Sequence, residues 1–281
     1  MTRPTPATIA YERAGQGSPL VLLHPLGADR HVWDPVVPLV ATRREVIAID
    51  LPGFGESPAL AGQVPTPRAL AAAVAEHLAA IRVDRPHVAG NSLGGWVALE
   101  LGLSGVAGSV SGIAPAGLWP EPLVPKAAIA HRLARSLLPA ARWCAGTRAG
   151  RSALLSGAVA HPRRVPAVAA RQLVHAYALA PDFVRVNDAM RAGRFEGLER
   201  IRCPVTLVWP DHDRLIRRPV WVPDRVRNVV LSDAGHMPMW DASEALAEIL
   251  IAASGGEDGE GGEGGDRVSP SLQEELAGEA S

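Results

Sequence analysis

The stretch His87-Val88-Ala89-Gly90-Asn91-Ser92-Leu93-Gly94-Gly95 decides the fold. Its first three residues predict a buried strand, and helical spacing follows from Gly95 to Leu103. A Gly-Xaa-Ser-Xaa-Gly pattern between a strand and a helix puts the serine on a strained turn, because the flanking glycines remove side chains that would clash there. We therefore expect the Ser92 hydroxyl above the edge of a sheet, where it can act as a nucleophile. The competing interpretation is a glycine-rich turn whose serine has no chemical role.

Apolar, β-branched runs alternate with helical patterns on both sides of this turn. That alternation is typical of an α/β fold with a mostly parallel, doubly wound sheet. Residues 8–13 can supply one further strand at the N-terminal side. The other expected strands are Val21–Leu23, Glu45–Ile49, His87–Ala89, Val110–Ile113, Val205–Trp209 and Val229–Leu231. Helices are expected at Leu70–Ile81 and Ala242–Ala253, in addition to the one that follows Ser92.

The strand pattern stops between about Trp119 and Arg200. Arginines and small apolar residues recur there at helical spacing, interrupted by prolines. This predicts a helical insertion, residues 119–200, that forms a lid on a core made of residues 1–118 and 201–253. From Ser254 to Ser281, glycine and acidic residues dominate, which predicts a disordered acidic tail because so few apolar groups can be buried.

The net charge of −1 hides two regions of opposite charge. Residues 254–281 hold eight acidic residues and one arginine, whereas residues 120–200 hold thirteen basic residues and five acidic ones. We interpret the basic excess as solvated helix faces, with a preference for anionic or polar-headed substrates as the alternative. The nearly neutral total does not predict a nucleic-acid partner.

The cysteines and the apolar runs indicate the compartment. Cys144 and Cys203 stand far apart and without metal-ligand spacing, which favours a reducing environment. No apolar stretch near Met1 resembles a signal peptide, and no apolar run reaches the ~20 residues of a spanning helix. We expect a cytoplasmic protein with a small-molecule substrate, no metal, no cofactor and no stable membrane insertion. The amphipathic segment 126–143 could dock on membranes, but a lid helix that faces its own pocket is favoured.

A serine hydroxyl needs a base during attack, normally a histidine that a carboxylate orients. His236 is the best placed of nine histidines, because it follows a predicted strand in a tight turn before the last helix. The acid should follow a strand between the serine and the histidine, where Asp211 and Asp213 both stand. We favour Asp213, since a longer loop is usually needed to carry the acid over the sheet. Either aspartate could instead cap a loop or a helix.

These segments together resemble the α/β-hydrolase family, over roughly residues 9–251. His24-Pro25-Leu26-Gly27 resembles the family's oxyanion loop, although proline stands where the family commonly has glycine. The segment from Asp50 to Ser57 resembles its Asp-Xaa-Xaa-Gly-Xaa-Gly-Xaa-Ser turn. Trp209-Pro210-Asp211-His212-Asp213 resembles its Trp-Gly-Xaa-Xaa-Asp segment, in which the last residue is the catalytic acid. The resemblance thus supports Asp213 independently.

The resemblance also implies roles for residues outside this set of three. The backbone N–H groups of Leu26 and Leu93 would form the oxyanion hole, each donor contributing about 3 kcal/mol to transition-state stabilisation. Asp50 would stabilise its own turn without touching substrate. The residues implied to line the substrate pocket, each of which could equally belong to the core, are Trp33, Trp96 and Met237.

The function follows from the site and not from the fold. Ser92, Asp213 and His236 predict acyl transfer through an acyl-enzyme, with carboxylic esters, lactones or thioesters as substrates. Family members that open epoxides or remove halides place aspartate at the serine position, which disfavours those reactions here. Carbon–carbon bond hydrolases share the Gly-Asn-Ser-Xaa-Gly-Gly segment but commonly carry tryptophan where this chain has Met237. Three alternatives stay open: a carbon–carbon bond hydrolase, a cofactor-free perhydrolase and a non-catalytic protein that binds a small molecule.

Overall fold

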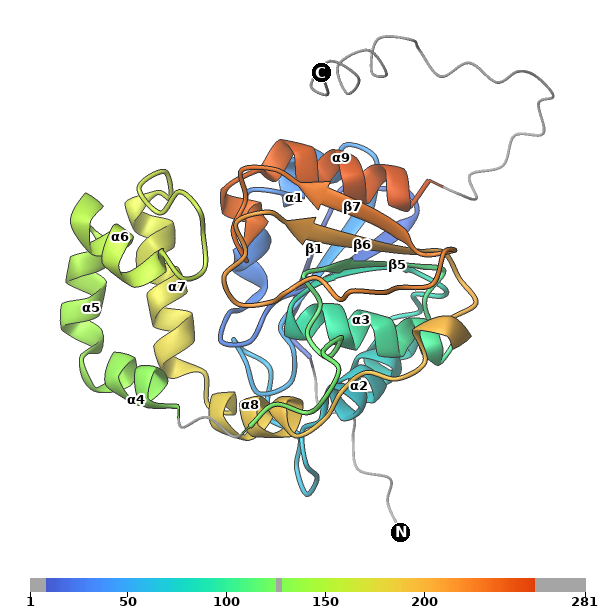
Figure 1. Cartoon of the computed structure of the whole chain (residues 1–281), viewed down its shortest axis with the longest axis horizontal. Helices are drawn as coiled ribbons and strands as arrows, with labels where there is room; N and C mark the ends of the chain where they lie inside the picture. The colour runs from blue at the N-terminus through green and yellow to red at the C-terminus, as the bar shows by residue number, and fades with distance from the viewer. Residues whose placement is uncertain (1–8, 125–127, 256–281) are drawn as a thin grey trace, which may run out of the picture.

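The computed structural model describes residues 9–124 and 128–255 and contains one seven-stranded sheet (Figure 1). The strand order is β1-β3-β2-β4-β5-β6-β7. β1 is antiparallel to β3, and every other neighbouring pair is parallel, which confirms the predicted mostly parallel α/β sheet. The strands are β1 Tyr11–Ala14, β2 Pro19–Leu23, β3 Glu45–Ile49, β4 His87–Asn91, β5 Ser109–Ile113, β6 Val205–Pro210 and β7 Arg227–Leu231.

Helices cover both faces of this sheet, because its parallel strands are apolar on both sides. On β2, Val21 and Leu23 face α2 (Pro67–Ala80) and α3 (Leu93–Leu103), in one core cluster. Leu20 and Leu22 face the other way, toward α1 (Val37–Val40) and α9 (Ser243–Ala253). The two-residue period of the strand thus divides the core into two layers.

Helix boundaries differ from the prediction where a cap extends the element. α2 begins at Pro67, three residues earlier than predicted, because the Thr66 hydroxyl accepts the Ala69 N–H at 3.1 Å and proline suits the first helical turn. The short helices η1 (Arg30–Trp33) and α1 were not predicted, since four residues are too few to show a helical period. η3 (Pro238–Trp240) precedes α9.

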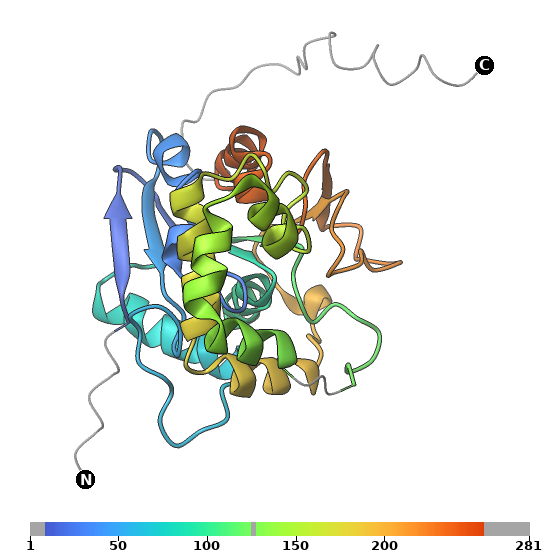
Figure 2. The same ribbon diagram turned by 90° about the vertical axis from the view of Figure 1, so that its left-hand side faces the viewer.

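Between β5 and β6 the described chain forms helices and no strand. Figure 1 shows the first four of these helices beside the edge at which the parallel strands end, and Figure 2 shows them in front of the sheet. The elements are α4 Ile129–Ser136, α5 Leu138–Ala145, α6 Arg148–Leu155, α7 Ala167–Leu179, α8 Phe183–Arg191 and η2 Leu198–Arg200. Lys126 and the predicted tail from residue 256 onward lie outside the described residues. In the described part of the chain, none of the helices has the length and apolar composition that crossing a bilayer requires.

Candidate active site

The strand order reverses direction next to β2. The chain passes from β2 to β3 on one side and then crosses over to β4 on the other side. Leu23 is in register with Gly90, so the loops after β2 and β4 leave the sheet side by side. In open α/β sheets, ligands bind in the crevice outside the carboxyl ends of the strands at such a reversal. Both the segment His24–Gly27 and Ser92 start from this point.

Ser92 occupies the strained turn that the glycine pattern predicts. Its backbone has φ 54° and ψ −112°, a positive φ that is rare for any residue other than glycine. A Cβ on Gly90 would lie 2.1 Å from the Gly94 carbonyl oxygen, and a Cβ on Gly94 would lie 2.3 Å from that of Leu23. Only glycine therefore allows the helix to begin so close to the strands. The Ser92 N–H donates to the Ile113 carbonyl at 2.9 Å, which holds the turn in place.

Asp213 and His236 form a buried hydrogen-bonded pair. His236 Nδ1 lies 2.7 Å from Asp213 Oδ2, and the two side chains are 6% and 3% exposed. Asp213 Oδ1 also accepts the N–H groups of Leu215 at 2.7 Å and Ile216 at 3.0 Å. Burial alone would raise the pKa of Asp213, but the hydrogen bond and charge of His236 and the two N–H donors outweigh it and lower that pKa. Since the ionised carboxylate can only accept, Nδ1 carries the hydrogen and Nε2 is the basic nitrogen.

The neighbouring Asp211 is placed differently. Its Oδ1 accepts the Ala234 N–H at 3.3 Å, and its own N–H donates to the Leu231 carbonyl at 3.1 Å. Asp211 therefore joins the loops after β6 and β7, whereas Asp213, two residues further, reaches the imidazole. The geometry favours Asp213 over Asp211 as the orienting acid, and that role stays a prediction.

Asn91 connects the serine turn to the histidine loop. Its fully buried side-chain amide donates to the carbonyls of Ile113 at 3.0 Å and His236 at 2.9 Å. No local sequence pattern indicates the contact with the His236 carbonyl, because it joins residues 145 positions apart. Within the described residues no hydrogen bond joins Ser92 Oγ to His236 Nε2 directly; such catalytic contacts are often long before substrate binds.

The predicted oxyanion donors lie on the two loops that leave the sheet side by side. Leu93 is the first residue of α3, where backbone N–H groups have no acceptor inside the helix. Leu26 lies two residues after His24, whose Nε2 accepts the Leu51 N–H at 2.9 Å and whose Nδ1 donates to the Pro25 carbonyl at 2.8 Å. Among the hydrogen bonds of the described residues, neither the Leu26 nor the Leu93 N–H has an acceptor. Both are therefore available to a developing negative charge.

The insertion reaches this site with an aromatic cluster, which we define as His131, Tyr177 and Phe183. The His131 ring stacks on Phe183 at 4.4 Å between centroids, and Tyr177 meets both rings edge-on. A Cβ on Gly27 would lie 2.7 Å from Tyr177 Cδ2 and 3.0 Å from Phe183 Cε2, so the cluster touches the loop that carries Leu26. No motif in the insertion indicated these residues.

The three residues implied to line the pocket are buried. Trp33 is 0% exposed inside the core layer of α1 and α9, which favours its alternative interpretation as a core residue. Trp96 is 4% exposed, donates to Glu100 at 3.0 Å and meets Trp119 edge-on. Met237 is 8% exposed, and its N–H donates to the Ala158 carbonyl at 2.7 Å, which ties the histidine loop to the insertion.

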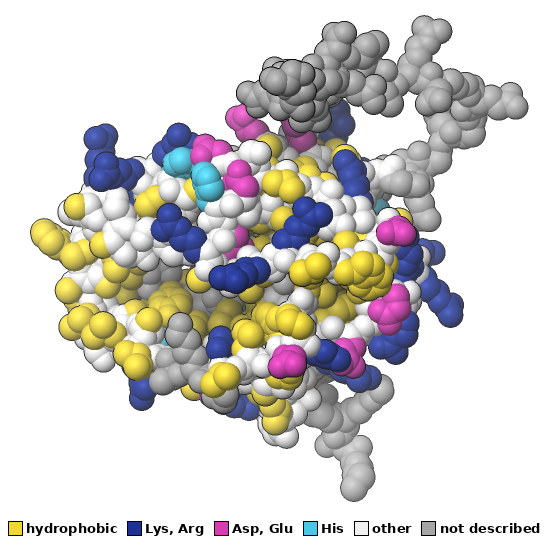
Figure 3. Space-filling view, in the orientation of Figure 1, with side chains coloured by type: hydrophobic (Ala, Val, Ile, Leu, Met, Phe, Trp, Pro, Cys, Tyr) yellow, Lys and Arg dark blue, Asp and Glu magenta, His cyan; other side chains and the backbone are white. Residues whose placement is uncertain are grey.

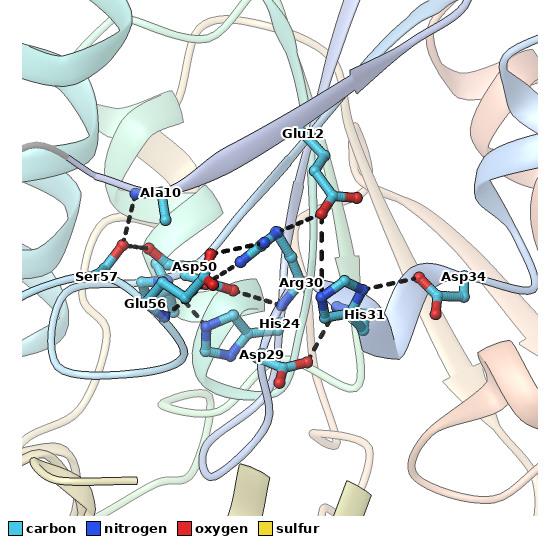
Figure 4. Close-up of polar contacts among 11 residues, drawn as sticks. Ala10, Glu12, His24, Asp29, Arg30, His31, Asp34, Asp50, Glu56 and Ser57 are labelled. Atoms are coloured by element: carbon cyan, nitrogen blue, oxygen red, sulfur yellow. Dashed lines mark hydrogen bonds and ion pairs between the residues drawn. The ribbon is translucent and has the colours of Figure 1, made fainter. Parts of the chain in front are cut away.

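Asp50 lies at the same edge of the sheet but in a different network (Figure 4). Its carboxylate accepts the Arg30 N–H at 2.7 Å, the Arg30 guanidinium and the Glu56 N–H at 2.9 Å. Burial opposes the charge of Arg30, but the hydrogen bonds with Glu12 and Glu56 and the charge of Asp50 raise its pKa above the ordinary value. Within the described residues, no group of three or more His, Cys, Asp and Glu side chains is arranged to hold a metal ion.

Comparisons with known proteins relate this chain to hydrolases. The family model described as "Alpha/beta hydrolase family" matches residues 20–249. Pimeloyl-[acyl-carrier protein] methyl ester esterase of Aeromonas hydrophila is 47% identical over 97 residues, which cover 34% of this chain and 37% of that protein. Epoxide hydrolase EphH of Mycobacterium tuberculosis is 32% identical over 181 residues, which cover 59% of this chain and 85% of that protein.

Solved structures agree on the fold. A bacterial membrane phospholipase A is 27% identical with a TM-score of 0.69, covering 88% of this chain and 82% of that one. The enol-lactonase of Burkholderia xenovorans has the same TM-score at 18% identity, covering 87% and 95% of the two chains. This chain spans less than two thirds of the length of the first curated relatives that it matches. The family model nevertheless covers most of the sequence, and the chain belongs to the alpha/beta hydrolase family.

Proposed function

We propose that this protein is a serine hydrolase that cleaves a small-molecule carboxylic ester through an acyl-enzyme on Ser92. The observation that carries the proposal is the buried Asp213–His236 hydrogen bond of 2.7 Å, held by Asn91 beside the strained turn of Ser92. An idle serine would need neither the backbone strain nor a histidine oriented by a buried carboxylate. Two similar proteins, the esterase of Aeromonas and the membrane phospholipase A, carry names that agree with ester chemistry.

Acylation uses the basic Nε2 of His236. As the Ser92 oxygen bonds to the substrate carbonyl carbon, Nε2 takes the hydroxyl proton and the carbonyl electrons move to oxygen. The N–H groups of Leu26 and Leu93 donate to that oxygen, each contributing about 3 kcal/mol in comparable sites. The tetrahedral intermediate then expels the alcohol, which takes the proton from Nε2. Throughout, the Asp213 carboxylate stabilises the imidazolium and keeps its ring oriented.

Deacylation repeats these steps with water. Nε2 takes a proton from the attacking water, the same two N–H groups hold the oxyanion, and Ser92 regains its proton as the acid leaves. An epoxide opening would instead require a carboxylate nucleophile at this position, since the ester intermediate must be cleaved at its carbonyl. Ser92 therefore supports ester hydrolysis over the reaction that names the Mycobacterium tuberculosis relative.

We infer that the insertion, residues 119–200, acts as a lid that shapes the acyl or alcohol pocket. Support comes from two contacts with the site. The aromatic cluster touches Gly27 of the loop that carries Leu26. The second contact is made through Asp241, which accepts the N–H group of Ala160 in the insertion at 2.8 Å and that of Gly235 at 2.9 Å. Asp241 thereby joins the insertion to the residue before His236.

The test is a substrate panel measured on the full chain. It contains p-nitrophenyl esters of several acyl lengths, a thioester and a ring-cleavage dienoate, each with wild type, Ser92→Ala and the matched control Ser104→Ala. Ser104 is an exposed serine at the other end of α3. We expect ester turnover that Ser92→Ala abolishes and Ser104→Ala preserves. Equal turnover by wild type and Ser92→Ala would refute the proposal, and turnover of the dienoate alone would assign carbon–carbon bond hydrolysis instead.

A further inference from the structure

We propose that the outer surface of α4 and α5 docks this protein on anionic lipid membranes. We call it the outer insertion surface and define it by seven residues that lie within fifteen positions. Figure 3 shows hydrophobic side chains along the left-hand edge of the molecule, over these helices, with basic side chains above and below. The seven residues are Ile129, Arg132, Leu133, Arg135, Leu137, Arg142 and Trp143.

The apolar members of this surface are unusually exposed. Ile129 is 65% exposed, Leu133 57%, Leu137 52% and Trp143 72%. Ile129, Leu133 and Leu137 follow one another at intervals of four, which places them along one side of the helical segment. Single exposed apolar residues are ordinary, but a contiguous group marks an interaction surface. Tryptophan is enriched at the boundary between lipid and water, where its ring meets the lipid and its N–H meets water.

The acidic and basic residues in this stretch of the sequence all have one sign. Residues 128–179 contain eight arginines and no aspartate or glutamate. Within the described residues, no ion pair reaches Arg132, Arg135 or Arg142; the guanidinium of Arg142 lies 3.2 Å from His175 Nδ1. These three guanidinium groups therefore keep their charge available to an external anion. Aliphatic and tryptophan side chains flanked by unpaired cations fit the surface of a bilayer that contains anionic lipids.

The opposite side of α4 leads to the site. His131 lies between Ile129 and Leu133 in sequence but is only 4% exposed, because its ring stacks on Phe183 in the aromatic cluster. That cluster touches Gly27 in the loop of Leu26. Docking of α4 would therefore bring the aromatic side of the site close to lipid, where lipophilic esters concentrate. The contact that we propose is peripheral, because apolar side chains on the outside of an amphipathic helical segment enter only the boundary of the bilayer.

The test is flotation of the full chain with vesicles of phosphatidylcholine alone and with vesicles that also contain 30 mol% phosphatidylglycerol. Two variants remove the apolar and the charged halves of the surface separately: Leu133→Ser with Trp143→Ser, and Arg132→Gln with Arg135→Gln and Arg142→Gln. Two controls change exposed residues elsewhere: Trp221→Ser, in which the tryptophan is 71% exposed, and Arg43→Gln with Arg68→Gln and Arg202→Gln. Thermal melts verify that each variant is folded. This readout does not depend on hydrolysis, so it can fail while the proposed function stands.

We expect wild type to bind the anionic vesicles at least tenfold more tightly than the neutral ones, with binding weakened by added salt. Each surface variant should lose most of this binding, while both controls retain it. Equal binding to both vesicles, no binding at all, or an equal loss in Trp221→Ser would overturn the proposal. A change in oligomeric state of the surface variants without vesicles would also overturn it, and would show that a second copy of the chain covers this surface.

Discussion

Asp50 and Asp213 both follow a parallel strand at the same edge of the sheet, β3 in one case and β6 in the other. Each carboxylate is buried, and each accepts two backbone N–H groups and one side chain. The side-chain partner differs: Arg30 for Asp50 and His236 for Asp213. A guanidinium keeps its protons at every pH that proteins tolerate, whereas an imidazole that donates from one ring nitrogen can accept a proton on the other. The same carboxylate geometry therefore stabilises structure at one site and can support proton transfer at the other.

The largest expected difference between Asp50 and Asp213 concerns the rate of ester hydrolysis. Asp213→Asn should lower kcat for an activated ester by roughly 10³- to 10⁴-fold, because the amide no longer holds the productive imidazole tautomer. The melting temperature should change little, since the oxygen of the new side-chain amide can still accept the backbone N–H groups. Steady-state kinetics with p-nitrophenyl esters measure the loss. Asp211→Asn is the matched control, and a greater loss in that variant would transfer the role to Asp211.

Asp50→Ala should show the opposite pattern, a loss of stability without loss of the reaction. The variant removes the buried carboxylate of the Arg30 ion pair and leaves the N–H groups of Arg30 and Glu56 without that acceptor, although Glu12 and Glu56 still pair with the guanidinium. Removing one partner from such a buried network costs about 3–5 kcal/mol. Urea unfolding should therefore shift strongly toward lower denaturant, while kcat of the molecules that stay folded is preserved. Arg13→Gln breaks the more exposed pair with Glu45 and should cost less than about 1 kcal/mol. Equal costs in the two variants would contradict this account of Asp50.

Replacement of Asn91 should have an intermediate effect on both kcat and the stability of the fold. Asn91→Ala removes the donor that holds the His236 carbonyl and leaves two buried carbonyls without that partner, at a cost of about 1–3 kcal/mol in stability. Displacement of the imidazole should lower kcat about tenfold with little change in KM, because misplaced catalytic groups lose rate and not ground-state binding. Kinetics and urea unfolding on the same preparation measure both. Unchanged kcat alongside reduced stability would leave Asn91 a purely structural residue.

The smallest expected effect is the pH dependence of stability. The pKa of Asp213 is lower in the folded protein than in the unfolded chain, where it is about 3.9. Its contribution is therefore fully present above that value and is lost as pH falls through the lower folded pKa. The small stability advantage that wild type has over Asp213→Asn near neutral pH should shrink further as pH falls from 5 toward 3, measured by urea midpoints. A difference that grows with acidity would contradict the lowered pKa.

Local sequence patterns predicted those parts of the site that depend on residues close together in the sequence. Glycines around Ser92, β-branched runs and the spacing of Asp213 after its strand each act over a few residues, so the sheet and the pairing of Asp213 with His236 could be anticipated. Contacts between distant segments could not. The Asn91 amide meets the His236 carbonyl, and Asp241 meets Ala160, only because the fold brings separate loops together.

The sequence also could not predict which buried aromatic side chains belong to the core and which lie at the site. Trp33 carries no signal that separates a core position from a pocket wall, since both demand a large apolar side chain. The aromatic cluster was missed for a similar reason, because its three rings come from helices whose arrangement no local pattern specifies. The proposed role of the insertion as a lid therefore depends on contacts that no sequence motif indicated.

Covalent labelling with a fluorophosphonate tests the central claim most directly, because it measures nucleophile activation without a known substrate. Intact mass and peptide mapping of the full chain would be recorded for wild type, Ser92→Ala and His236→Ala, with the exposed His212→Ala as the matched control. The account predicts one adduct, on Ser92, which is absent in Ser92→Ala, formed far more slowly in His236→Ala and unchanged in His212→Ala. Wild type that stays unlabelled, or an adduct that persists in Ser92→Ala, would contradict it.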